Sequence, residues 1–181
     1  MNIISPFIAS YEKRIVKNNF LSNLYCFVYR QVVKREINLG FITDQDTVLN
    51  IGCGAVPYTA IYMAMLSGAK IWAVDRDREA AEKAGFLIKK LGLQNRVNII
   101  NEDGSKIIPV QFTAAVVALQ AEPKKHILTN LLANSSTRTR FILREAKKIV
   151  QNQYDILPQE YQPVKRLTHI MLTFNSILLI K

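Results

Sequence analysis

The chain contains few of the residues from which metal centres and disulfide frameworks are built. Its 181 residues include two cysteines, Cys26 and Cys53, and two histidines, His126 and His169. Two cysteines form neither a disulfide framework nor a zinc cluster, and the histidines have no cysteine or acidic residue at ligand spacing. We therefore expect no metal site, a reducing cytoplasmic location, and surface positions rather than base catalysis for both histidines.

Long apolar runs are also absent. No stretch reaches the roughly 18 apolar residues of a membrane span, and the start of the chain lacks the basic region and apolar core of a secretory signal. Hydrophobic residues make up 49% of the chain and charged residues 21%, as is ordinary for a soluble globular protein. We expect a single domain that does not contact a membrane.

Acidic residues are scarce beside basic ones. The chain has 14 Asp and Glu against 24 Lys and Arg, which gives a net charge of +10. Such an excess permits binding to nucleic acid. The basic residues are scattered among helical patterns, however, where a solvated face is expected. Nucleic acid is therefore an alternative partner that the sequence does not favour over a small molecule.

The central motif is a predicted buried strand that ends in a glycine turn. Residues 47–51 form a short apolar run, Gly52-Cys53-Gly54 interrupts it, and Pro57 suits the first position of a helix. Two glycines a residue apart let the backbone turn tightly and let a ligand lie against bare main chain. The free N–H groups of the helix start favour negative charge or hydroxyls nearby. The pattern indicates a nucleotide-like ligand over this turn.

Acidic side chains follow the next two predicted strands. Residues 71–74 are followed by Asp75, about twenty residues beyond the glycines, where a carboxylate can accept both ribose hydroxyls of an adenosine. Residues 97–100 precede Asp103, which can accept a hydrogen bond from an adenine amine. The alternatives are a loop residue or a helix cap for Asp75, and an Asp-Gly turn residue for Asp103.

Together, the glycine turn, Asp75 and Asp103 resemble the class I S-adenosylmethionine-dependent methyltransferases, over about two thirds of the chain. In that family a Rossmann-like sheet carries such residues after its first three strands. The chain departs from it at Asn50, where many members carry an acid, and at Pro57, which replaces a third glycine. The resemblance implies S-adenosylmethionine as cofactor. It also implies these cofactor-binding residues: Ile51, Gly52, Cys53, Gly54, Asp75, Arg76, Asp103, Gly104, Ser105, Leu119 and Gln120.

A second resemblance is to the nicotianamine synthases. It is carried by the turn GCGAVPYT at 52–59, by the expected helix after Glu122, and by the segments 116–119, 141–144 and 174–177. It implies transfer of the aminocarboxypropyl arm of the cofactor instead of its methyl group. That family relies on a helical domain ahead of the first strand, where this chain has only about 45 residues. The short segment favours methyl transfer to a small molecule.

The remaining pattern alternates strands and helices, which predicts an α/β fold. We expect a Rossmann-like, doubly wound, mostly parallel sheet with an antiparallel C-terminal hairpin, preceded by a short helical N-terminal segment. Residues 1–44 are that segment, and residues 45–181 are the cofactor-binding domain of the same globule. The expected strands are 48–51, 71–74, 97–100, 112–119, 140–143, 164–168 and 174–180. The expected helices after the first strand are 58–67, 78–91, 123–132 and 145–151.

The N-terminal segment is expected to form two helices, with a break near residues 18–19 and a stop at Gly40. Packed beside the first strand, it could form one wall or a lid of the ligand site. Tyr11, Tyr25 and Tyr29 are candidates to line that wall, and the alternative is that they belong to the core.

No catalytic residue is identified. The segment after the fourth strand lacks the Asn/Asp-Pro-Pro-aromatic string associated with methylation of amines on bases. Gln120 there can orient a substrate but cannot take its proton, and Glu122 is interpreted as a helix-start residue. Nucleophilic catalysis by Cys53 would need a lowered thiol pKa. A cofactor-binding module without turnover therefore stays an alternative, and so does an NAD-dependent oxidoreductase, against which Pro57 and the C-terminal hairpin speak.

Overall fold

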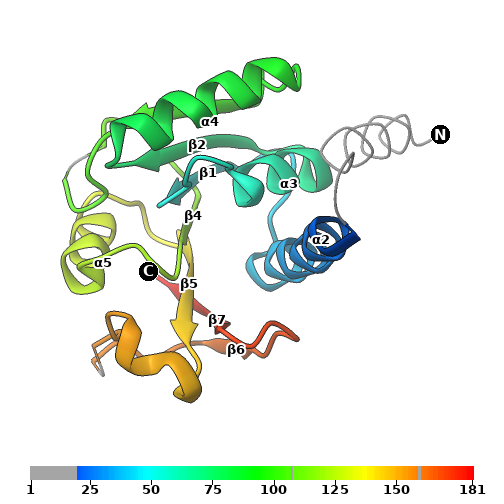
Figure 1. Cartoon of the computed structure of the whole chain (residues 1–181). Helices are drawn as coiled ribbons and strands as arrows, with labels where there is room; N and C mark the ends of the chain where they lie inside the picture. Colours follow the sequence, from blue (N-terminus) through cyan, green and yellow to red (C-terminus); the bar gives the residue numbers. More distant parts are fainter. Residues whose placement is uncertain (1–19, 107, 159) are drawn as a thin grey trace.

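A seven-stranded sheet forms the centre of the computed structural model, which describes residues 20–181 except 107 and 159 (Figure 1). The strand order is β3-β2-β1-β4-β5-β7-β6. The strands are β1 (Thr47–Ile51), β2 (Lys70–Asp75), β3 (Val97–Asn101), β4 (Ala114–Val117), β5 (Arg140–Ala146), β6 (Lys165–Leu167) and β7 (Phe174–Ile180). The first five are parallel, and β7 is antiparallel to both β5 and β6. The predicted doubly wound sheet with an antiparallel C-terminal hairpin is confirmed.

Helices cover both faces of the sheet (Figure 1). They are α2 (Phe20–Gly40), α3 (Tyr58–Ser67), α4 (Arg78–Lys90) and α5 (Lys124–Ala133). Val48 packs with residues of α2, α3 and α4, whereas the next residue, Leu49, packs with residues of α5. Successive strand residues point to opposite faces, so a continuous apolar strand supplies both cores. Each fully buried side chain of this size contributes about 1.5–3 kcal/mol.

Local signals fix the ends of the helices around the glycine turn. The Asp77 side chain accepts the N–H groups of Glu79 and Ala80 and so caps α4. The cap of this helix is therefore Asp77 and not Asp75, which leaves the latter for another role. Pro57 is the residue before α3 rather than its first residue, and its carbonyl accepts the Ile61 N–H at 2.9 Å.

The segment after residue 143 differs from the prediction. A helix was expected at 145–151, but β5 continues to Ala146, where it pairs with Phe174 of β7. The partner strand supplies the hydrogen bonds that a helix would otherwise supply within the segment. A 3₁₀ helix, η1 (Lys148–Gln153), follows. The fourth strand is shorter than the expected 112–119, because only 114–117 pairs with its neighbours.

The N-terminal expectations are tested in part. Helix α2 ends at Gly40, as predicted, and packs against α3 and β5. The expected first helix and Tyr11 lie outside the described residues, and so does the side chain of Tyr25. None of the described helices is both long enough and apolar enough to cross a membrane.

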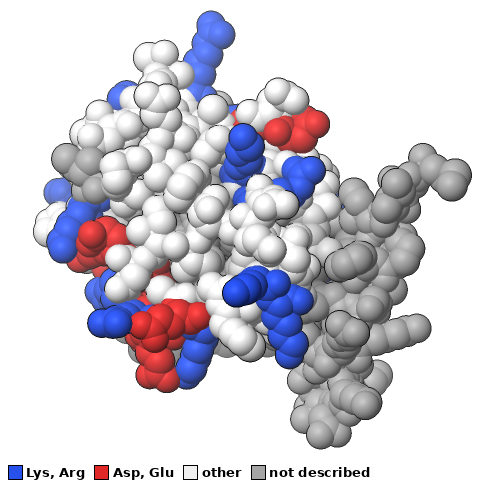
Figure 2. Space-filling view, turned by 90° about the horizontal axis from the view of Figure 1, so that it is seen from above, with Lys and Arg blue, Asp and Glu red and all other residues white. Residues whose placement is uncertain are grey.

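The excess positive charge does not gather into one patch on the face seen in Figure 2. Basic side chains are dispersed there, and acidic side chains lie beside several of them. The structure contains such pairs on α4, where Arg78 meets Glu82 and Lys83 meets Glu79. Such dispersion is typical of a solvated surface. The face seen in Figure 2 therefore offers no continuous basic patch to which nucleic acid could bind.

Candidate functional site

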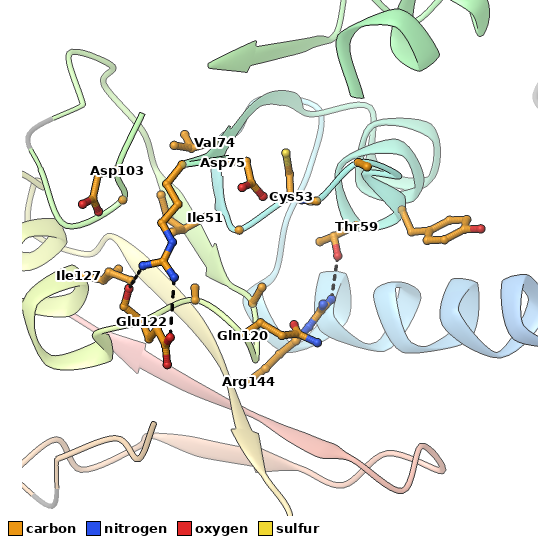
Figure 3. Close-up of a pocket in the computed structure, with 18 of the residues that line it drawn as sticks. Ile51, Cys53, Thr59, Val74, Asp75, Asp103, Gln120, Glu122, Ile127 and Arg144 are labelled. Carbon is orange, nitrogen blue, oxygen red and sulfur yellow. Dashed lines mark hydrogen bonds and ion pairs between the residues drawn. The ribbon is translucent and has the colours of Figure 1, made fainter. Parts of the chain in front are cut away.

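A cavity of about 480 Å³ lies at the carboxyl ends of β1, β2 and β4 (Figure 3). Ligands of open parallel sheets bind at this edge, where the strand order reverses. The cavity wall includes all but two of the residues expected to bind the cofactor: Ile51, Gly52, Cys53, Gly54, Asp75, Arg76, Asp103, Gly104 and Gln120. The two exceptions are Ser105 and Leu119. Cofactor contact by these residues stays a prediction.

The glycine turn is tied to the end of β2. The N–H groups of Gly52 and Cys53 donate to the carbonyl of Val74, and the Gly54 N–H donates to Asp75 Oδ2 at 2.7 Å. Gly54 has a φ of +68°, and a Cβ there would meet no atom within 4 Å, so its main chain faces open space. Asp75 Oδ1 accepts only the Asp77 N–H among the described residues. Each carboxylate oxygen therefore retains a lone pair for a ligand hydroxyl.

Asp103 is both a turn residue and part of the cavity wall. Its Oδ1 accepts the N–H and the hydroxyl of Ser105, at 2.9 and 2.8 Å. These two bonds hold the pKa of the Asp103 carboxyl below its ordinary value. Gly104 presses so closely on Ile51 that a Cβ would collide with that side chain. Ser105 thus orients Asp103 from outside the cavity, and Gly104 keeps the turn next to β1.

A buried lysine, which was not predicted as a site residue, holds the loop after β4. Lys124 is 2% exposed, and its Nζ donates to the carbonyls of Leu119 and Ala121 at 2.7 and 3.3 Å. Burial lowers the pKa of this amine. The loop so pinned places Gln120 in the cavity wall, while Leu119 itself is buried in a small apolar cluster.

Arg76 and Glu122 connect the two sides of the cavity. Arg76 extends from the end of β2, and its Nη2 lies 3.7 Å from Glu122 Oε1, just before α5. Both side chains are more than half exposed, so the pair contributes little to stability. Because Glu122 faces a guanidinium, it is a poor candidate for a base.

Cys53 is expected to be unreactive. Burial, helped by the nearby Asp75 carboxylate, raises the pKa of its thiol to about 12. At pH 8 the thiolate fraction is then on the order of 10³-fold below that of an ordinary cysteine. Iodoacetamide labelling of the folded protein, mapped by mass spectrometry, should leave Cys53 unmodified, and the guanidinium-unfolded chain should be labelled there. Rapid labelling in the folded state would contradict this prediction.

The sequence analysis missed a cluster of polar residues at the other end of the cavity. Tyr29, Thr59 and Arg144 line it there, and Figure 3 shows the Arg144 guanidinium pointing at Thr59. Behind them, Arg144 Nε and Nη2 donate to the two carboxylate oxygens of Glu36 at 2.9 and 2.8 Å. Ser176 of β7 donates to the same carboxylate at 2.6 Å. Only Tyr29 had been named as a candidate, from its place in an aromatic-rich helix.

The expectation of a surface position was wrong for His169. The residue is 3% exposed, and its Nε2 lies 2.8 Å from Ser176 Oγ. Because the serine hydroxyl donates to Glu36, its oxygen accepts from the histidine, so Nε2 carries the proton. Burial lowers the pKa of His169 to about 4, and the imidazole is neutral at pH 7. His126 is exposed on α5, as expected.

The residues of the cavity fit an adenosine ligand. Bare main chain at Gly54 and the side-chain oxygens of Asp75 meet at one point, and Asp103 lies just beyond the end of the neighbouring strand. The described residues contain no group of three side chains that could hold a metal ion. The arrangement can bind a nucleoside and place its attached groups toward Gln120, Tyr29 and Arg144.

Comparison with known proteins agrees with this geometry. The model of the family described as Protein-L-isoaspartate(D-aspartate) O-methyltransferase (PCMT) matches residues 27–125. The L-histidine 2-aminobutanoyltransferase of Yersinia pestis is 26% identical over 120 residues, which are 66% of this chain and 45% of that protein. The chain thus spans less than half the length of this relative.

Two solved structures show the same fold. MtNAS, a nicotianamine synthase, in complex with S-adenosylmethionine has a TM-score of 0.78 at 22% identity, over 97% of this chain and 72% of that one. An RNA methyltransferase of Salinibacter ruber in complex with S-adenosyl-L-homocysteine has a TM-score of 0.69 at 16% identity, over 83% of this chain and 90% of that one.

Proposed function

The chain belongs to the protein-L-isoaspartate(D-aspartate) O-methyltransferase (PCMT) family of S-adenosylmethionine-dependent methyltransferases, whose model matches more than half of it, and we propose on this premise that it transfers the methyl group of S-adenosylmethionine to a small molecule. The cofactor is S-adenosylmethionine. The observation that carries the proposal is the contact between Gly54 and Asp75, because it lies in the matched region and at the sheet edge where nucleosides bind.

The residues of this chain would bind and orient, and the cofactor would bring the chemistry. When bound, S-adenosylmethionine supplies a sulfonium methyl group, which passes to the acceptor while the bonding electrons return to sulfur. Asp75 accepts the ribose hydroxyls, and Asp103 accepts a hydrogen bond from the adenine amine. Gln120 orients the acceptor near the methyl group, where a separation of about 3 Å is needed.

Proton removal is not assigned to a side chain. Gln120 cannot take a proton, Glu122 faces Arg76, and the pKa of Cys53 is too high for a thiolate. An acceptor whose nucleophile is already deprotonated at neutral pH, or loses its proton to water, fits these residues best. The cavity volume of about 480 Å³ is typical of small-ligand sites and has to hold the cofactor as well, which favours a small acceptor.

A second candidate is transfer of the aminobutanoyl arm of the same cofactor. It is favoured by the name of the Yersinia pestis relative and by the likeness to MtNAS over nearly the whole chain. Both reactions break a bond at the same sulfur, so they would use the same nucleoside site. They differ in the nucleoside product that remains after the transfer.

We expect S-adenosylhomocysteine as the nucleoside product. Purified protein is incubated with S-adenosylmethionine and a metabolite extract, and the nucleosides are quantified by mass spectrometry. Methyl transfer leaves S-adenosylhomocysteine, whereas aminobutanoyl transfer leaves methylthioadenosine. The Asp75→Ala variant is the control, because either product should depend on cofactor binding. Protein-dependent methylthioadenosine that is missing with this variant would establish the second candidate instead.

A further inference from the structure

An ion pair crosses the cavity at the carboxyl end of β1. Arg76 directly follows β2, and Glu122 lies in the loop between β4 and α5. In the sheet, β2 and β4 flank β1 on its two sides, so the strands that carry this pair are about 10 Å apart. Both residues line the cavity, and Arg76 Nη2 lies 3.7 Å from Glu122 Oε1 (Figure 3). The pair is therefore a bridge from one side of the cavity to the other.

This bridge is weak enough to open. Arg76 Nη1 also donates to the main-chain carbonyl of Glu122, but at 3.4 Å, so both contacts of the guanidinium are long. The two side chains are 61% and 55% exposed, and water competes with pairs of this kind. The closed arrangement is thus favoured over the open one by no more than roughly fivefold.

A second hollow lies on the other side of the bridge. It has a volume of about 550 Å³, and its wall includes Pro123 and residues 152–155 at the end of η1. Among the described residues, Arg76 and Glu122 belong to the walls of both this hollow and the cavity. The bridge therefore separates the two spaces, and its opening would join them.

The main chain on either side of the bridge is fixed. On the β2 side, Asp75 is bonded to the Gly54 N–H of the glycine turn. On the β4 side, the buried Lys124 holds the loop before α5 through two carbonyls, and its own N–H donates to Asp155 Oδ2 at 2.6 Å. Neither side can shift without breaking these bonds. The bridge would therefore open by rotation of its two side chains.

We propose that the Arg76–Glu122 bridge is a gate through which the nucleoside enters and leaves the cavity. The inference rests on the proposed function, because it takes the cavity as the site of the cofactor. The expected contacts of the nucleoside, at Gly54 and Asp75, lie in the cavity, whereas the second hollow is the more open of the two spaces. Glu122 acts here as a positioning residue that holds Arg76 across the entrance.

A gate has a kinetic signature that a ligand contact lacks. A gate that is closed for part of the time slows entry and exit by the same factor, and it leaves the dissociation constant unchanged. Loss of a direct contact instead raises mainly the dissociation rate constant, and binding becomes weaker. The two rate constants together therefore distinguish a gate from a contact.

The variant that tests the gate is Glu122→Gln, which removes the charge and keeps the size of the side chain. Binding of S-adenosylhomocysteine to the immobilised full chain is followed by surface plasmon resonance. The association and dissociation rate constants should both be roughly two- to fivefold higher than in the wild type. The dissociation constant should stay the same.

Salt provides a second readout. Raising the ionic strength from about 0.1 M to about 1 M shortens the Debye length from about 10 Å to about 3 Å and screens the exposed pair. Both rate constants of the wild type should then rise toward those of Glu122→Gln, whereas those of the variant should change little. S-adenosylhomocysteine has no net charge at neutral pH, so long-range steering of the ligand does not contribute.

A matched control is the pair of Lys125 and Glu160. Its atoms are 3.6 Å apart and its side chains are 62% and 57% exposed, but neither residue lines the cavity. Glu160→Gln should change neither rate constant. Unchanged rate constants in Glu122→Gln would overturn the inference, and so would a higher dissociation rate constant alone, which indicates a ligand contact. Failure of the wild type to bind S-adenosylhomocysteine at all would refute the proposed function, and the inference with it.

Discussion

Replacement of Arg144 by methionine is expected to lower the free energy of unfolding by about 3–5 kcal/mol, because it leaves the Glu36 carboxylate buried without its counter-ion. The side chains of this pair are 4% and 0% exposed. Urea denaturation followed by circular dichroism measures the change. The control is Arg166→Met. Arg166 pairs with Glu145, and the Arg166 side chain is 62% exposed. The expected loss in free energy of unfolding is therefore about 0–1 kcal/mol.

The pH dependence gives an independent check on the same pair. Burial raises the pKa of Glu36, but the charge and hydrogen bonds of Arg144 outweigh burial and bring the pKa below its ordinary value of 4.5. A lowered carboxyl pKa stabilises the folded state above the ordinary value, and this contribution is lost as the pH falls through the folded-state value. The difference in free energy of unfolding between wild type and Arg144→Met should therefore decrease below pH 4.5. If this difference in free energy of unfolding were the same at pH 7 and in acid, the result would contradict an ionised buried pair.

Asp75→Ala should weaken binding of S-adenosylhomocysteine by roughly ten- to a hundredfold, since a charged acceptor of hydrogen bonds is lost. The structure adds a second reason for the loss. Asp75 Oδ2 also accepts the Gly54 N–H, so its removal releases the glycine turn against which the ligand lies. Calorimetry with S-adenosylhomocysteine measures the change. The fold should be retained, because the side chain is only half-buried at the end of a strand.

Asp77 supplies the matched control for this experiment. It lies two residues away and caps α4, but it does not line the cavity. Asp77→Ala should cost about 0.5–2 kcal/mol of stability and leave the affinity unchanged. If Asp75→Ala behaved like Asp77→Ala, with lower stability and full affinity, Asp75 would be a structural residue only.

The parts of the site that the sequence predicted are those encoded by neighbouring residues. The glycine turn, Asp75 and Asp103 each follow an apolar run, and parallel strands bring their carboxyl ends to one edge. A local pattern was therefore enough to place these residues around one cavity. The parallel arrangement of β1 to β5 follows from the same alternation of strands and helices.

The opposite end of the cavity was not predicted, although Thr59, Arg144 and Ser176 lie in the segments that resemble the nicotianamine synthases. Glu36 and Arg144 are 108 residues apart. In the sequence, each resembles any other charged residue of a strand or helix. His169 resembled a surface residue for the same reason, since its polar partners come from β7 and α2. Buried polar networks are satisfied by tertiary neighbours, so their members are recognised only when the fold is known.

The position of β7 between β5 and β6 also bears on how the protein is made. This strand follows all other strands in the chain, yet it covers the edge of β5, from which Arg144 extends. It also brings Ser176 to Glu36 and the ring of Phe174 to the guanidinium. Until β7 has left the ribosome and paired with β5, the edge of β5 is open and Glu36 and Arg144 are exposed to water. The nucleoside end of the cavity can form earlier in translation, and the arginine end is completed only when the last strand is inserted.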